Sequence, residues 1–164
     1  MSIETVRTKI LNAWRDLPLI PANEIAYSAD ELDFERDAVA QFFAGKHWRD
    51  VSWVELQKYD GDCSACLSFM SPAAYRYYLP VYMFVALDHY RESDVSADSA
   101  WLSLSPPTDA TFVQHWADRV AGFSTSQRDA VLSFFEFMIH EHGNDYTYDR
   151  ERLNNAVSYW GNTL

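Results

Sequence analysis

The stretch that decides the fold runs Ser71-Pro72-Ala73-Ala74-Tyr75-Arg76-Tyr77-Tyr78-Leu79-Pro80-Val81-Tyr82-Met83-Phe84. It opens with a serine, whose hydroxyl can cap a helix, and a proline at the first helical position, where the missing N–H is not needed. The second proline, Pro80, removes the hydrogen bond to the carbonyl of Arg76, and its ring crowds that group. The stretch therefore predicts a central, tyrosine-rich helix from Pro72 to about Arg91, kinked at Pro80.

Helical signals recur on both sides of this stretch. The apolar spacing and the helix-start and helix-stop residues predict helices over 2–16, from 28 or 30 to 44, from 50 or 52 to 56–58, from 108 or 109 to 122, over 124–143 and over 148–160. Ser124 with Gln127 forms a capping-box pattern, and Gly45 and Gly143 are helix stops.

The remaining segments are predicted to be connections. Cys63–Met70 is a brief extended or helical connector, and Ser93–Pro107 is a polar, turn-rich loop. No convincing hairpin signal occurs anywhere in the sequence. We therefore predict an all-α fold in which residues 1–164 form one compact domain of about six or seven helices.

Composition and charge narrow the class of function. Hydrophobic residues make up 48% and aromatic residues 16% of the sequence, which is typical of a packed globular protein. With 24 acidic and 13 basic residues the net charge is −11, which repels nucleic acids and anionic membranes and favours a basic protein partner. The sequence lacks a secretory signal and a membrane-spanning apolar segment, so a cytoplasmic location is expected.

An acidic cluster is the strongest candidate for a partner-binding surface. Its residues are Asp30, Glu31, Asp33, Glu35 and Asp37, and Arg36 is the one nearby base. Acids near a helix N-terminus are also typical of a solvated helix face, so both readings stay open. We expect Trp48 and Trp53 to be exposed and to act as anchors, because interface energy concentrates in aromatic side chains.

A pocket around the tyrosines is the alternative site. Tyr75, Tyr78 and Tyr82 either belong to the core or line a ligand pocket in which Arg76 holds an anionic group.

Two further patterns have the residue types of metal sites. The spacing of Cys63 and Cys66 fits either two structural cysteines or a metal or disulfide pair. His140 and His142 fit either the end of a helix or a surface site for a divalent ion. Phosphate-binding glycine motifs and the serine nucleophile motif are missing from the sequence. We therefore predict no catalytic residues, no cofactor and no metal, and a protein that is not an enzyme.

Several segments resemble one family of small bacterial proteins of unknown function. They are 45–48, 67–80, 124–131 and 159–160, and the longest follows the pattern L-x-F-[LM]-[TS]-P-x-A-[FY]-x-Y-Y-L-P. Met70 and Ser71 stand where the family more often has leucine and threonine. The resemblance implies a compact helical domain and carries over no catalytic residue.

A second likeness concerns composition alone. Small acidic proteins without an enzyme motif are similar to immunity proteins, which neutralise toxins delivered between competing bacteria. Our leading hypothesis is an immunity-type protein that binds a basic toxin domain through the acidic cluster. The alternative is a small-molecule-binding protein or enzyme that uses the tyrosine-lined pocket.

Overall fold

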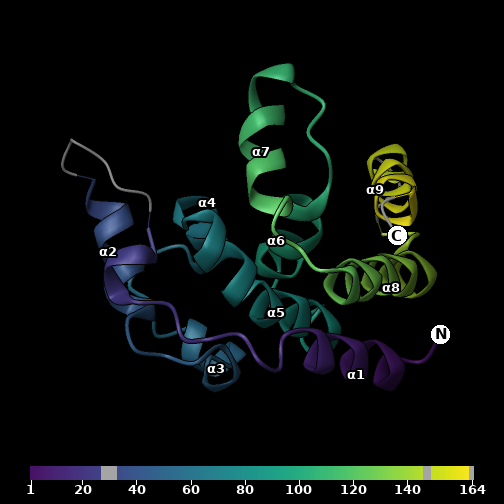
Figure 1. Ribbon diagram of the computed structural model, residues 1–164. Coiled ribbons are helices and arrows are strands. Elements are labelled where there is room, and N and C mark those ends of the chain that lie inside the picture. Colours follow the sequence, from purple (N-terminus) through teal and green to yellow (C-terminus); the bar gives the residue numbers. More distant parts are fainter. Residues whose placement is uncertain (27–32, 146–148, 163–164) are drawn as a thin grey trace.

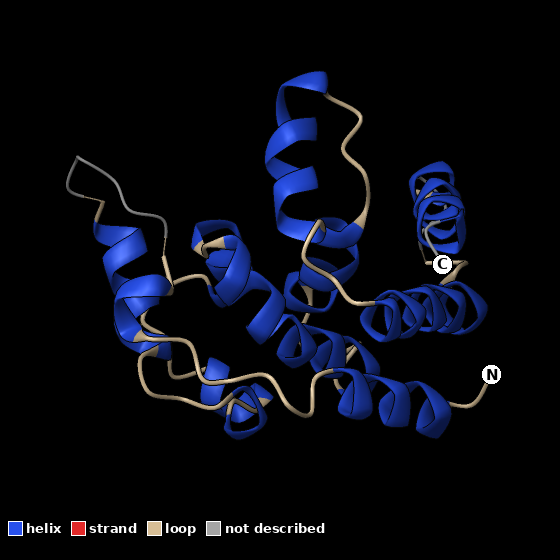
Figure 2. Cartoon of the chain, viewed as in Figure 1, coloured by secondary structure: helices blue, strands red, loops and turns tan. Residues whose placement is uncertain are grey.

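The computed structural model describes residues 1–26, 33–145 and 149–162, and its regular structure over these residues is helical (Figure 1, Figure 2). The α-helices are α1 (Ile3–Ala13), α2 (Phe34–Phe43), α3 (Trp53–Leu56), α4 (Cys66–Phe69), α5 (Pro72–Asp88), α6 (Val95–Leu104), α7 (Val113–Val120), α8 (Thr125–His142) and α9 (Arg150–Asn162). The all-α prediction is confirmed. The described ranges hold nine α-helices, so the predicted number of six or seven is wrong.

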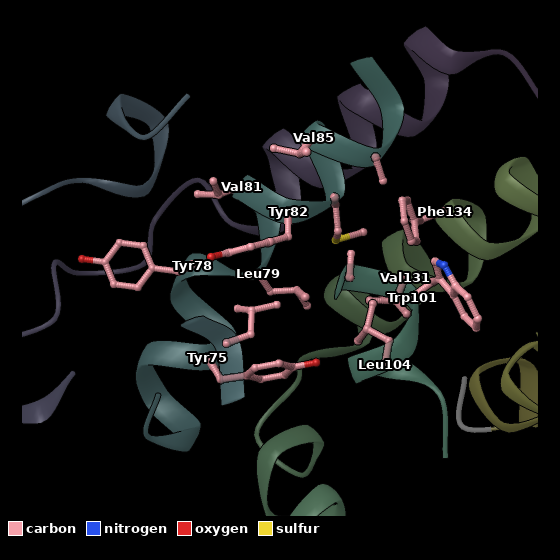
Figure 3. Close-up of a cluster of buried hydrophobic side chains, with 14 of the residues drawn as sticks. Tyr75, Tyr78, Leu79, Val81, Tyr82, Val85, Trp101, Leu104, Val131 and Phe134 are labelled. Atoms are coloured by element: carbon pink, nitrogen blue, oxygen red, sulfur yellow. The ribbon is translucent and has the colours of Figure 1, made fainter. Parts of the chain in front are cut away.

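Helix α5 lies at the centre of the molecule and is buried on all of its faces (Figure 1). Its neighbours in space are α1, α4, α6 and α7. Figure 3 shows its side chains meeting Trp101 and Leu104 of α6 and Val131 and Phe134 of α8. A helix that is apolar all round is stable in water only when other elements cover every face. In the described part of the chain, no helix is long and apolar enough to cross a membrane.

The start of α5 is fixed as the sequence predicts. Ser71 is the N-cap, and its hydroxyl accepts a hydrogen bond from the backbone N–H of Ala74 at 3.2 Å. The same hydroxyl donates to the carbonyl of Glu24 at 2.6 Å. One serine therefore both starts the central helix and holds the preceding segment against it.

Pro80 lies inside α5, and the tryptophan that follows α1 compensates for the hydrogen bond that it removes. The carbonyl of Arg76 loses its usual donor, because residue 80 has no N–H. The indole Nε1–H of Trp14 donates to this carbonyl at 2.6 Å, and Trp14 is fully buried. The chain at the end of α1 is thereby joined to the middle of α5.

The caps of α8 also agree with the sequence prediction. The Ser124 hydroxyl accepts from the Gln127 N–H at 3.2 Å, and the Gln127 side chain accepts from the Ser124 N–H at 3.0 Å. This reciprocal pair completes the predicted capping box. Gly143 follows the last turn as predicted. Helix α8 packs against both α1 and α9 (Figure 1).

The prediction of a polar loop over Ser93–Pro107 is wrong, because this segment contains helix α6. Ala97, Ala100, Trp101 and Leu104 are buried at helical spacing, and α6 packs against α5. The serines that suggested a loop bond back to the preceding turn, as when the Ser105 hydroxyl donates to the Trp101 carbonyl at 2.8 Å. The Ser103 and Ser105 hydroxyls are therefore satisfied by the preceding turn, and the Ser99 hydroxyl also donates to the Ser64 carbonyl.

Other boundaries differ by a few residues. The predicted starts of the second helix, Ser28 and Asp30, lie outside the described residues, and α2 begins after Asp33. Helix α5 ends at Asp88 rather than near residue 91. The connector over 63–70 is helical, with a 3-10 turn η3 (Cys63–Ala65) that leads into α4.

The bond from Trp14 to the Arg76 carbonyl predicts a coupling between two substitutions. Trp14→Phe leaves a buried carbonyl without a donor and should lower the free energy of unfolding by about 1–3 kcal/mol. In a Pro80→Ala background the new N–H can reach that carbonyl, so the same substitution should cost about 1 kcal/mol less. Urea unfolding of the four proteins measures this difference.

Trp160→Phe is the matched control for this cycle. Its indole donates to the carbonyl of Leu104 at 3.0 Å, where no proline has removed a donor. Its effect should be the same with and without Pro80. Equal losses for Trp14→Phe in both backgrounds would contradict the coupling.

Candidate functional site: an acidic surface with an exposed aromatic side chain

The acidic cluster lies at the N-terminus of α2. Asp33 is the N-cap, and its carboxylate accepts hydrogen bonds from the backbone N–H groups of Glu35 and Arg36, both at 3.2 Å. It also forms an ion pair with Arg36 at 3.0 Å. Glu35 and Asp37 are exposed in the first turn, whereas Asp30 and Glu31 lie outside the described residues.

Phe34 stands among these acids and is the most exposed large hydrophobic side chain of the described residues, at 81%. The opposite face of α2 buries Val39 and Phe43 in the core. Phe34 lies five residues before Val39, which turns it about 140° away from the buried stripe. We call Asp33, Phe34, Glu35 and Asp37 the acidic surface.

Phe34 is not among the anchors predicted from the sequence. The signal was available in the helical register, because a phenylalanine out of phase with Val39 and Phe43 must face away from the core. The predicted anchors are Trp48 and Trp53 instead, and that prediction rests on residue type alone.

The prediction that Trp48 is exposed is wrong. Gly45 follows α2 with a φ of 71°, and the chain then turns so that the 3-10 turn η2 (Trp48–Asp50) packs on α5. Trp48 is only 2% exposed, and its ring stacks on Phe84 at 6.4 Å between centroids. Trp53 is half-buried and lines the same hollow of about 330 Å³. These two tryptophans belong to a hollow beside α5 and not to the acidic surface.

The three tyrosines of the predicted pocket are fully buried, and their hydroxyls bond to the chain (Figure 3). Tyr78 donates to the carbonyl of Phe43 at 2.9 Å, and Tyr82 donates to that of Cys63 at 2.7 Å. Tyr75 bonds to the hydroxyl of Ser103 at 3.0 Å, and burial raises its pKa to about 12. These tyrosines therefore hold neighbouring segments onto α5 as core residues.

Arg76 is also committed to the fold. Its guanidinium group donates to the carbonyl of Gly122 at 2.7 Å, in the turn between α7 and α8. It therefore holds a main-chain carbonyl, where the pocket hypothesis placed an anionic ligand.

The cysteines and histidines of the two metal-type patterns each have their own surroundings in the structure. Cys63 and Cys66 are free thiols, and Cys66 is buried. His140 is exposed beside Glu141, whereas the ring of His142 stacks on Tyr90 at 3.6 Å. Within the described ranges, no three His, Cys, Asp or Glu side chains are placed to share a metal ion.

The environment of Cys66 predicts slow thiol labelling. Burial raises the pKa of this thiol from 9.0 to about 12, and only the thiolate reacts with alkylating agents. In the native protein at pH 8, iodoacetamide should modify Cys66 about a thousandfold more slowly than in urea. Mass spectrometry of timed samples measures both rates, with half-buried Cys63 as the internal control. Equal rates with and without urea would contradict this assignment.

The comparison with protein families gives a match over residues 21–164, to a family of unknown function, DUF6714. No curated protein and no solved structure matches the chain. The matched region includes the acidic surface, the central helix α5 and every later helix. The chain therefore belongs to the DUF6714 family of unknown function.

Proposed function

We propose that this protein binds a basic protein partner through its acidic surface, with Phe34 as the aromatic anchor. The observation that carries the proposal is the 81% exposure of Phe34 between Asp33, Glu35 and Asp37. In the finer form of the proposal, the protein is an immunity-type inhibitor and the partner is a basic toxin domain.

Charge and apolar contact have different tasks in this proposal. A net charge of −11 accelerates the encounter with a cationic partner, and exposed carboxylates orient the two proteins. Asp33 is already paired with Arg36, so Glu35 and Asp37 are the acids most available to the partner. Burying a phenylalanine side chain adds roughly 1.5–3 kcal/mol, which is the size of an interface hot spot.

Co-expression with the product of the neighbouring gene tests the partner directly. We expect the two proteins to purify as a complex, and we expect the present protein to protect cells against growth inhibition by its partner. Failure to form a complex together with failure to protect would overturn the proposal. A complex without protection would retain partner binding and reject the immunity role.

Phe34→Ala tests the anchor. Because the side chain is exposed, the substitution should change the free energy of unfolding by less than about 0.5 kcal/mol. It should weaken the complex by about 2 kcal/mol, or roughly thirtyfold in Kd. Phe112→Ala is the matched control, since Phe112 is also exposed, at 57%, but is not part of the acidic surface. Equal effects of the two substitutions on Kd would place the interface elsewhere.

A pair of charge-neutralising variants tests the steering acids. Glu35→Gln combined with Asp37→Asn should lower the association rate and its dependence on salt concentration. The control removes two exposed acids from α8 and α9, by Glu136→Gln and Glu151→Gln. A larger loss of association rate in the α2 variant than in the control would support the proposal. Equal losses in the two variants would show that only the total charge matters.

A further inference from the structure

We propose that a second site, independent of the acidic surface, binds a small organic carboxylate that carries an apolar group. The site is a cavity of about 480 Å³, within the range of about 300–1,000 Å³ that is usual for small-molecule pockets. Its walls come from α4, α6, α7 and α9. We call it the arginine pocket, after Arg119 of α7 and Arg152 of α9, which both line it.

Both guanidinium groups are held in fixed positions by the fold. Arg119 is only 7% exposed, donates to the carbonyl of Ser68 at 2.6 Å and lies over the ring of Tyr75 at 5.1 Å. Arg152 donates to the carbonyl of Leu102 at 3.1 Å and lies over the ring of Trp101 at 5.9 Å. Figure 3 shows the Tyr75 ring at the bottom of the cluster and the Trp101 ring at its right edge, beside Phe134. Arginines anchored on rings and carbonyls are preorganised to bind an anion.

Neither guanidinium group has a carboxylate partner among the described residues, and the Nε–H of each is buried without a hydrogen-bond acceptor there. Two inward arginines that lack an acidic partner within the described ranges are unexpected in a protein of net charge −11, because buried cations are usually paired. A bound carboxylate would supply the missing negative charge. It would also accept hydrogen bonds from the terminal guanidinium nitrogens. The two oxygens of a carboxylate match the forked donors of a guanidinium group.

The charge of the lining favours an anion with a single charge. Asp98 is the one acidic residue among those that line the cavity, and it accepts a hydrogen bond from the Trp101 indole at 2.9 Å. His115 also lines the cavity, and burial, followed by the charge of Arg119, lowers its pKa, which favours the neutral ring at pH 7. The two arginines and Asp98 leave one net positive charge, which suits a carboxylate better than a polyphosphate.

The rest of the lining favours an apolar body on the ligand. Leu67, Leu102 and Trp116 form walls of the cavity, and Phe112 lines it with a side chain that is 57% exposed. The Ser99 and Ser105 hydroxyls donate to main-chain carbonyls, so they offer the ligand few donors. Specificity therefore rests on the two arginines and on apolar contact with the rest of the lining.

Binding of 2-naphthoate, with 2-naphthamide as its neutral match, tests this inference. Calorimetry gives the affinity, and the indole N–H resonance of Trp116 reports whether the ligand occupies the pocket. We expect 2-naphthoate to shift this resonance and to bind at least about tenfold more tightly than the amide, since charge-assisted hydrogen bonds are lost with the charge. Inorganic phosphate should bind more weakly than 2-naphthoate, because it lacks the apolar group.

Three arginine variants complete the test. Arg152→Gln and Arg119→Gln should each weaken 2-naphthoate binding by about tenfold or more. Arg128→Gln is the matched control: Arg128 also lies over a ring, that of Trp160 at 5.7 Å, and bonds to main-chain carbonyls, but it does not line the pocket. If Arg119→Gln fails to fold, the less buried Arg152→Gln still decides the result.

Three results would overturn the inference. They are the absence of 2-naphthoate binding, equal affinity for the acid and the amide, and an unchanged affinity in Arg152→Gln. Because the arginine pocket and the acidic surface share no residue, Arg152→Gln should leave binding of the basic protein partner unchanged, and each proposal can fail without the other.

Discussion

The hydrogen bond from the Trp14 indole to the Arg76 carbonyl is the contact on which the arrangement of helices depends. Pro80 creates the need for it, because a buried carbonyl without a donor costs about 1–3 kcal/mol. The donor comes from the residue that follows α1, so α1 is fixed beside α5, and α8 then packs on α1. The side chain of the same Arg76 holds the Gly122 carbonyl, where a larger residue would collide with the guanidinium group. One residue therefore positions both the first helix and the turn before α8.

The sequence predicted those elements whose start and end signals are local. Ser71 with Pro72 and Ser124 with Gln127 act within one helical turn, so their effect can be read without knowing the fold. Helix α6 was missed because its serines resemble a loop until their hydroxyls are seen to bond to carbonyls in the preceding turn. The exposure of Trp48 depends on how the chain turns after Gly45, which residue type does not reveal. The arginine pocket joins four helices, one of them α6, so the spacing of residues along the chain contains no sign of it.

Positive and negative charges are placed differently in this protein. The acids at the start of α2 are on the surface, whereas several guanidinium groups are turned inward onto aromatic rings. The pairs are Arg119 on Tyr75, Arg128 on Trp160 and Arg152 on Trp101, at 5.1–5.9 Å from the ring centroids. A cation over a ring face gains stabilisation without a carboxylate, so these three arginines do not pair with the described acids at the start of α2. Both proposed sites follow from this separation: the acids face outward to a basic protein, and two inward arginines face a cavity.

The burial of α5 on every face has a consequence for how the protein opens. A bundle with an exposed helix can release that helix while the rest stays intact, because few contacts are lost. Here α1, α4, α6 and α7 all contact α5, and the buried tyrosine hydroxyls bond the segments near residues 43 and 63 to it as well. Exposing the amides of α5 to solvent therefore requires the loss of contacts with several elements at once. Unfolding of this domain should accordingly be cooperative, with the slowest hydrogen exchange at its centre.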